Sequence, residues 1–179
     1  MKKPILLALL GAASFCAPAQ AQVTFDMAKL SCADYNAMDP IAAQTTAAWM
    51  SGWFNQRLGN TVINLEGYRR NVANVGGWCV ANPSANIMAG LQAAMDNAQT
   101  QQGGPTAINA AQITCGQFLK TKGEEHLLVA SWMGGWFMST KNLTNVDPRY
   151  TRRNSEKIVA YCKGHKGESL MAAVKEIWR

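Results

Sequence analysis

The chain contains two copies of one pattern, Trp49-Met50-Ser51-Gly52-Trp53-Phe54 and Trp132-Met133-Gly134-Gly135-Trp136-Phe137. The copies are 83 residues apart, and the same displacement aligns residues 26–96 with residues 109–179 without a gap. This alignment has 15 identities in 71 positions, about three times what unrelated sequences would give. We infer that the chain is a tandem duplication of one ancestral unit.

Residues 1–21 have the features of a cleavable signal peptide. A basic start precedes the apolar stretch Ile5–Phe15, which is shorter than the roughly 20 residues of a membrane span, and Ala19-Gln20-Ala21 fits a signal peptidase site. The mature chain should therefore begin at Gln22. Lipidation of Cys16 is disfavoured because the bulky Phe15 precedes it. Cleavage lowers the formal charge from +6 to +4.

Each unit carries two cysteines at aligned positions, Cys32 and Cys79 in the first and Cys115 and Cys162 in the second. Four cysteines in an exported protein indicate disulfides, and three pairings are possible. Crossed pairings would require an ancestral unit without its own bond. The repeat therefore favours Cys32–Cys79 and Cys115–Cys162, one disulfide in each unit.

The composition is that of a globular protein, with 48% hydrophobic and only 16% charged residues among 179. The Gln-, Gly- and Pro-containing segment between the units has no apolar side chains to bury at its centre. The expected organisation is a first unit at 22–95, a flexible linker at 96–108 and a second unit at 109–179.

Local signals within each unit are helical. Ser31 and Thr114 stand where a helix N-cap would precede each first cysteine. Asp39-Pro40 opens a helix of about 19 residues that Gly59 closes, and Asp147-Pro148 opens one that reaches Lys163. Two alanine- and methionine-rich amphipathic segments, at 84–95 and 169–178, end the units. Without alternating β-branched runs, the sequence predicts an all-α fold with about four helices per unit.

Three segments of the second unit carry a resemblance to a known family: Thr114-Cys115-Gly116-Gln117-Phe118-Leu119, Val129-Ala130-Ser131-Trp132-Met133, and Lys157-Ile158-Val159-Ala160-Tyr161-Cys162-Lys163. They resemble the HdeA/HdeB acid-stress chaperones. The resemblance implies a periplasmic all-α protein with one disulfide per unit. Such proteins are folded and inactive near neutrality, and in acid they loosen and hold denatured clients soluble through exposed apolar surface, without ATP.

The chain departs from the family, whose members are single units that dimerise. A short linker keeps the two units at a high effective concentration, so we expect a monomer with an internal pseudo-dimer. The charge is also uneven, with a net −1 in residues 22–104 and +5 in residues 105–179. Asp147, Glu156 and Glu168 lie in the basic half and are the carboxylates most expected to pair with Lys or Arg.

In a helix, the aromatic and methionine residues of each repeated pattern form a wide apolar face. We expect these faces to be core in the neutral protein and to bind acid-denatured periplasmic proteins after opening. The expected client-binding residues are Trp49, Met50, Trp53, Phe54, Trp132, Met133, Trp136 and Phe137.

Other classes of function are disfavoured. The sequence has no Gly-rich phosphate loop or Ser-centred elbow, so we expect no enzyme and no cofactor. His126 and His165 are not repeated and have no second ligand at metal spacing, so no metal site is expected. Nucleic acid binding and stable membrane insertion are not expected either. The Arg-Arg-Asn triplets at 69–71 and 152–154 are either solvated helix faces or a site for an anionic partner. The other class left open is a helical binding module, such as an immunity protein that inhibits one secreted toxin.

Overall fold

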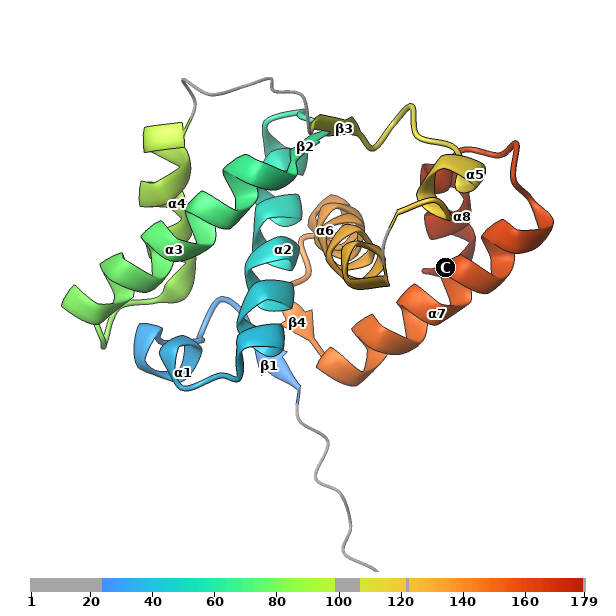
Figure 1. Cartoon of the computed structure of the whole chain (residues 1–179). Helices are drawn as coiled ribbons and strands as arrows, with labels where there is room; N and C mark the ends of the chain where they lie inside the picture. The colour runs from blue at the N-terminus through green and yellow to red at the C-terminus, as the bar shows by residue number, and fades with distance from the viewer. Residues whose placement is uncertain (1–23, 99–106, 122, 179) are drawn as a thin grey trace, which may run out of the picture.

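The computed structural model describes residues 24–98, 107–121 and 123–178. These residues contain eight helices, four in each half (Figure 1). The first half holds α1 (Cys32–Asn36), α2 (Pro40–Arg57), α3 (Leu65–Ala81) and α4 (Ile87–Ala98). The second holds α5 (Cys115–Phe118), α6 (Gly123–Thr140), α7 (Pro148–Gly164) and α8 (Leu170–Ile177). The predicted fold class, two tandem all-α units of about four helices, is confirmed.

The helices begin where capping side chains predict. Ser31 and Thr114 each accept a hydrogen bond from a backbone N–H inside the following helix, as half of a capping box. The carboxylates of Asp39 and Asp147 cap α2 and α7, each just before a proline at the first helical position. After α2, Gly59 adopts a φ of 66°, in the left-handed region that ends helices.

One disulfide closes each half. Cys32–Cys79 joins α1 to α3, and Cys115–Cys162 joins α5 to α7. All four cysteine side chains are fully buried. Because each bond lies inside one half, neither opposes the separation of the halves.

Short strands join the halves, and the sequence analysis did not predict them. β1 (Phe25–Asp26) pairs antiparallel with β4 (Asn145–Val146), and β2 (Val62–Asn64) pairs antiparallel with β3 (Ala107–Asn109). Each pair takes one strand from each half. In the 83-residue alignment β1 corresponds to β3 and β2 to β4, so the two pairs are equivalent. The strands are two or three residues long, which is too short to show an alternating pattern.

α2 and α6 cross at the centre of the molecule, with α1, α3 and α4 on one side and α5, α7 and α8 on the other (Figure 1). Buried side chains of both halves form one continuous hydrophobic core. The two halves are therefore packed together as a pseudo-symmetric pair within one chain.

Parts of the sequence-based organisation lie outside the described residues. These are the expected signal peptide, residues 1–21, and the start of the mature chain at Gln22. α4 continues to Ala98 and β3 begins at Ala107, so secondary structure occupies both ends of the segment that the sequence assigns to the linker. Among the described residues, no helix combines the length and apolar character needed to cross a membrane.

Candidate functional site

The crossing of α2 and α6 depends on two equivalent glycines. A Cβ atom on Gly52 would lie 1.8 Å from the carbonyl oxygen of Trp132, and one on Gly135 would lie 1.8 Å from that of Trp49. Both obstacles are backbone atoms, which a side-chain rotation cannot remove. The repeated glycine thus permits direct backbone contact between the two helices.

The residues expected to bind clients lie at and around this crossing. Trp49, Met50, Trp53, Trp132 and Met133 are buried, with exposed fractions between 0 and 7%. The other three, Phe54, Trp136 and Phe137, are half-buried. Five of the eight side chains therefore belong to the core, and the other three lie partly exposed. Their role in client binding remains a proposal.

Polar contacts also cross between the halves at this centre. The indole Nε1 of Trp53 donates to the carbonyl of Leu143 at 3.1 Å, and Arg57 donates to Asn142 Oδ1 at 2.6 Å. The hydroxyl of Ser139 donates to Gln56 Oε1 at 2.9 Å. Ser139 and Gln56 occupy aligned positions, so this bond lies near the pseudo-symmetry axis.

The symmetry of these contacts is incomplete. Trp136 aligns with Trp53, but its buried Nε1 has no hydrogen-bond partner among the described residues. The closed interface therefore leaves one buried indole donor unsatisfied in the second half, which opposes part of the stabilisation that burial of this ring provides.

Hydrogen bonds at the two strand junctions are equivalent in geometry but differ in charge. Thr144 Oγ1 donates to Asp26 Oδ1 at 2.7 Å in the β1–β4 junction. In the β2–β3 junction, Thr61 Oγ1 donates to Asn109 Oδ1 at 3.0 Å. The Thr144 hydroxyl, with smaller contributions from the Ala28 N–H and Lys29, lowers the pKa of Asp26. Only the Asp26 junction therefore titrates in acid.

Asp147 is the second carboxylate with a lowered pKa. It is nearly buried, it caps α7, and Arg149 binds it at 2.8 Å; this side-chain hydrogen bond is the main cause of the shift. Asn64 occupies the aligned position in the first half and caps α3 by accepting from the Gly67 N–H. At both aligned pairs, one half thus has an aspartate where the other has an asparagine.

The other two carboxylates expected to pair with Lys or Arg differ from that expectation. Glu168 accepts a hydrogen bond from the hydroxyl of Tyr161 at 2.8 Å. Glu156 is exposed on α7 and has no hydrogen bond or ion pair recorded within the described part of the chain. Its location in the basic half did not bring a guanidinium to it: Arg152 lines a hollow beside α6, and Arg153 lies over the Tyr150 ring.

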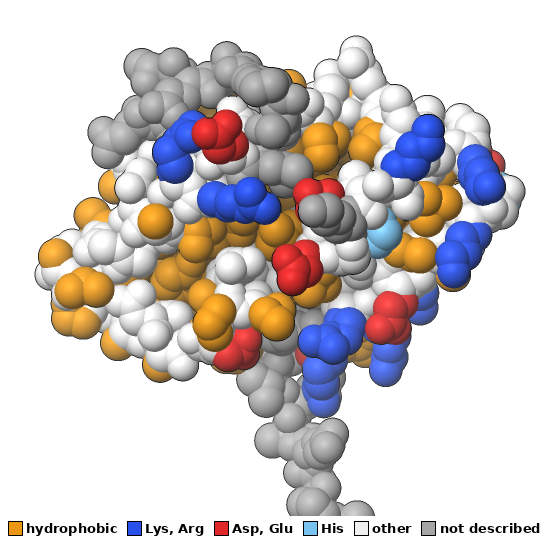
Figure 2. All heavy atoms as spheres, viewed as in Figure 1, with side chains coloured by type: hydrophobic (Ala, Val, Ile, Leu, Met, Phe, Trp, Pro, Cys, Tyr) orange, Lys and Arg blue, Asp and Glu red, His pale blue; other side chains and the backbone are white. Residues whose placement is uncertain are grey.

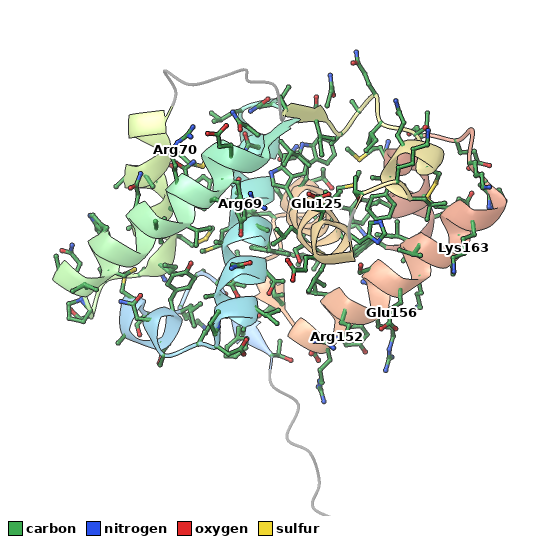
Figure 3. All side chains as sticks on the ribbon, viewed as in Figure 1. Arg69, Arg70, Glu125, Arg152, Glu156 and Lys163 are labelled. Carbon is green, nitrogen blue, oxygen red and sulfur yellow. A yellow bond between two sulfur atoms is a disulfide. The ribbon has the colours of Figure 1, made fainter. Side chains whose placement is uncertain are left out.

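A groove with charged walls lies beside the N-terminal end of α6, and we call it the axial groove. It consists of two hollows of about 340 and 430 Å³ that share Gln44, Glu124 and Leu128. Arg69 of α3 lines the first hollow and Arg152 of α7 lines the second, and these arginines occupy aligned positions. Figure 3 shows both arginines, with Glu125 and Glu156, around this end of α6.

Apolar side chains also line the axial groove, among its polar and charged residues. Leu127, Leu128 and Val72 contribute to it, and Ile41 is 58% exposed there. Figure 2 shows hydrophobic side chains at the surface in the middle of this face, among basic and acidic groups. No sequence signal points to Ile41, because it follows the helix-opening proline and belongs to no repeated motif.

The Arg-Arg-Asn triplets form no single site. Arg69 and Arg152 line the axial groove, whereas Arg70 pairs with Glu66 at 3.1 Å and Arg153 lies over the Tyr150 ring. All four arginines are exposed. These positions agree with solvated helix faces, and the groove-lining pair is the part that faces a potential partner.

Both histidines make structural contacts. His126 Nε2 lies 3.0 Å from the carbonyl of Phe118, and its ring packs on that phenylalanine. The His165 ring stacks on Tyr161. No group of three His, Cys, Asp or Glu side chains in the described ranges is arranged to hold a metal ion.

Comparison with family models identifies two successive matches to the HdeA/HdeB family, over residues 4–89 and 87–172. The second match begins and ends 83 residues after the first, the same displacement that aligns the two units. Comparison with curated proteins and with solved structures gives no match.

Proposed function

The chain belongs to the HdeA/HdeB family of periplasmic acid-stress chaperones, and we propose that it acts as an ATP-independent holdase in which the two halves of one chain replace a dimer of single units. In this proposal the signal peptide directs the chain to the periplasm, where the mature monomer is closed at neutral pH. Acid separates the halves, and the uncovered faces bind denatured proteins. Family membership supports a chaperone rather than an enzyme.

One observation supports this proposal most: residues of the repeated pattern pack against the opposite half, since Trp49 lies against Gly135 and Trp53 donates to the carbonyl of Leu143. Burial of a single large apolar side chain is worth about 1.5 to 3 kcal/mol. Separation of α2 from α6 would therefore expose a large apolar surface in a single step. Met and aromatic side chains suit varied clients because they are large, and methionine is also adaptable.

Acid weakens the junctions that hold the halves closed. The folded protein keeps the pKa of Asp26 and of Asp147 below the ordinary carboxyl value, so each ionised group adds stability above its unfolded pKa. That stability is lost as the pH falls through the folded pKa. Asp26 accepts its hydrogen bond from the other half, so its protonation weakens a contact between the halves directly.

Charge repulsion acts in the same direction. Full protonation of the carboxylates and histidines raises the side-chain charge of residues 22–179 from +4 towards +17. A high net positive charge opposes the compact state in which the two halves are packed together. The disulfides keep each half closed on itself meanwhile.

Light scattering tests the function. A denaturation-prone periplasmic protein is acidified to pH 2 to 3 with and without the purified mature chain, and a parallel sample is heated at pH 7. A holdase of this kind suppresses scattering in acid and has little effect at pH 7. A tight one-to-one complex with one secreted toxin at neutral pH, without protection in acid, would instead support the immunity-protein class.

A further inference from the structure

A cavity of about 320 Å³ lies in the second half, where α6, β4 and α7 meet Trp178. Trp49 of the first half forms part of its wall. Most of the lining is apolar, including Met138 and Val146. Its volume is within the range of small-molecule sites in proteins, roughly 300 to 1,000 Å³.

The cavity follows from a difference between the two units. In the first half, Tyr68 packs against α2, is 9% exposed, and donates its hydroxyl hydrogen to the carbonyl of Gln44. The aligned residue of the second half is Thr151, which lines the cavity. A threonine is far smaller than a tyrosine, so space that an aromatic ring occupies beside α2 is open beside α6.

An unpartnered amide faces this space. Asn154 lines the cavity and is only 8% exposed, and its side chain forms no hydrogen bond with the described residues. Its amide is not one of the fully buried polar atoms that lack a partner, so it stays accessible from the cavity, where a ligand can pair with it. Its buried polar neighbours already have partners: Ser131 donates to the carbonyl of Leu127 at 2.8 Å, and Arg149 binds the carboxylate of Asp147.

We propose that this cavity binds a small uncharged aromatic molecule that carries an amide group. The ring would lie among Trp49, Trp178 and the aliphatic wall, and its amide would pair with Asn154, which both donates and accepts hydrogen bonds. The carboxylate of Asp147 in the wall disfavours an anionic ligand. This proposal does not depend on holdase activity.

Binding would also stabilise the closed state. Thr24 and Trp49 come from the first half and the other walls from the second, so the cavity is complete only when the halves are together. A ligand that binds only the closed state lowers the pH at which the protein opens. Its effect should increase with ligand concentration.

Benzamide is a suitable probe, measured by two-dimensional NMR of the ¹⁵N-labelled mature chain at pH 7. We expect concentration-dependent shifts of the Asn154 side-chain amide and of the indole N–H signals of Trp49 and Trp178. Asn154→Ala should weaken benzamide binding about 5- to 10-fold. The matched control Asn71→Ala, at the aligned position of the first half, should bind as the parent does.

A second variant covers the case in which Asn154→Ala does not fold. Thr151→Tyr introduces the residue of the first half, and it should fill the cavity and abolish the shifts while helical circular dichroism is retained. Benzoate should bind more weakly than benzamide. The proposal is overturned if Thr151→Tyr binds benzamide as the parent does, if the shifts map elsewhere, or if benzoate binds more tightly.

Discussion

Gly52 in α2 lies against the backbone of Trp132 in α6 so closely that any Cβ atom would overlap the tryptophan carbonyl. Gly135 and Trp49 repeat this relationship from the opposite side. The glycines that let the halves pack together therefore belong to the same short pattern as the aromatic side chains buried at the crossing. The same six-residue pattern thus supplies both the close contact between α2 and α6 and the apolar side chains buried there.

Alanine at either glycine should loosen the closed state. Gly52→Ala or Gly135→Ala forces α2 and α6 apart, and we expect a loss of about 1 to 3 kcal/mol of stability, with dye binding and the red shift of tryptophan emission appearing at higher pH. Gly77→Ala is the control, because a Cβ there meets nothing within 4 Å and alanine favours helix. Equal behaviour of all three variants would contradict the proposed crossing.

Asp26→Asn should make opening less sensitive to acid. Asparagine reproduces Asn109 of the other junction and retains an oxygen for Thr144, but it cannot gain a proton. Because the pKa of Asp26 is lowered in the folded state, the parent loses stability as the pH falls below about 4, and the variant loses less. Because the variant lacks the stability that the ionised Asp26 supplies, fluorescence-monitored acid titration should give a shallower transition with a midpoint at higher pH.

Glu156→Gln is the control for that titration, since it removes the same charge from an exposed position that has no hydrogen bond or ion pair with the described residues. Its midpoint should stay close to that of the parent. If Glu156→Gln shifts the midpoint as far as Asp26→Asn, net charge rather than the β1–β4 junction controls opening.

Asp147→Asn should lower stability near neutrality but not in strong acid. The variant can still cap α7, as Asn64 caps α3, but it loses the charge that Arg149 binds. The pKa of Asp147 is lowered in the folded state, so the deficit should be constant above pH 5 and disappear as the pH falls through the folded value. Urea unfolding at several pH values measures this; a deficit independent of pH would refute it.

Polar substitutions in the repeated faces should reduce client protection in acid. Met133→Gln and Phe137→Ser are compared at pH 2, where closed packing no longer matters, by scattering of an aggregating client. We expect weaker protection than by the parent. Val80→Ser, at an exposed position outside these faces, is the control. If all variants protect equally, the faces are core only and clients bind elsewhere.

Reduction should unfold both halves. Each disulfide spans 47 residues and constrains the unfolded chain by an amount worth roughly 4 kcal/mol in the loop-closure model. That is a large share of the stability of a small domain. Far-ultraviolet circular dichroism with and without reductant measures the effect, and retained helicity after full reduction would show that packing alone suffices.

Much of the fold could be predicted because its signals are local or repeated. The caps at Asp39 and Asp147 and the left-handed Gly59 set helix ends through neighbouring atoms, and the repeat gave one disulfide per unit. The strand junctions could not be predicted, since residues 25–26 and 145–146 are distant in sequence and too short for a pattern. The same limit applies to the axial groove, whose walls come from four helices, and to the cavity beside Asn154.

The central claim is that the halves must separate before the apolar faces bind clients. Phe25 and Val146 are opposed in the β1–β4 pair, at a spacing that a disulfide can bridge, so Phe25→Cys with Val146→Cys locks the junction after oxidation. The most direct measurement is light scattering of a client at pH 2.5 in the presence of this variant. The oxidised form, in which the new disulfide locks the junction, is compared with a form whose two new cysteines are alkylated and cannot form the bond. We predict protection by the alkylated form and little by the oxidised one. Equal protection by both forms would contradict the claim.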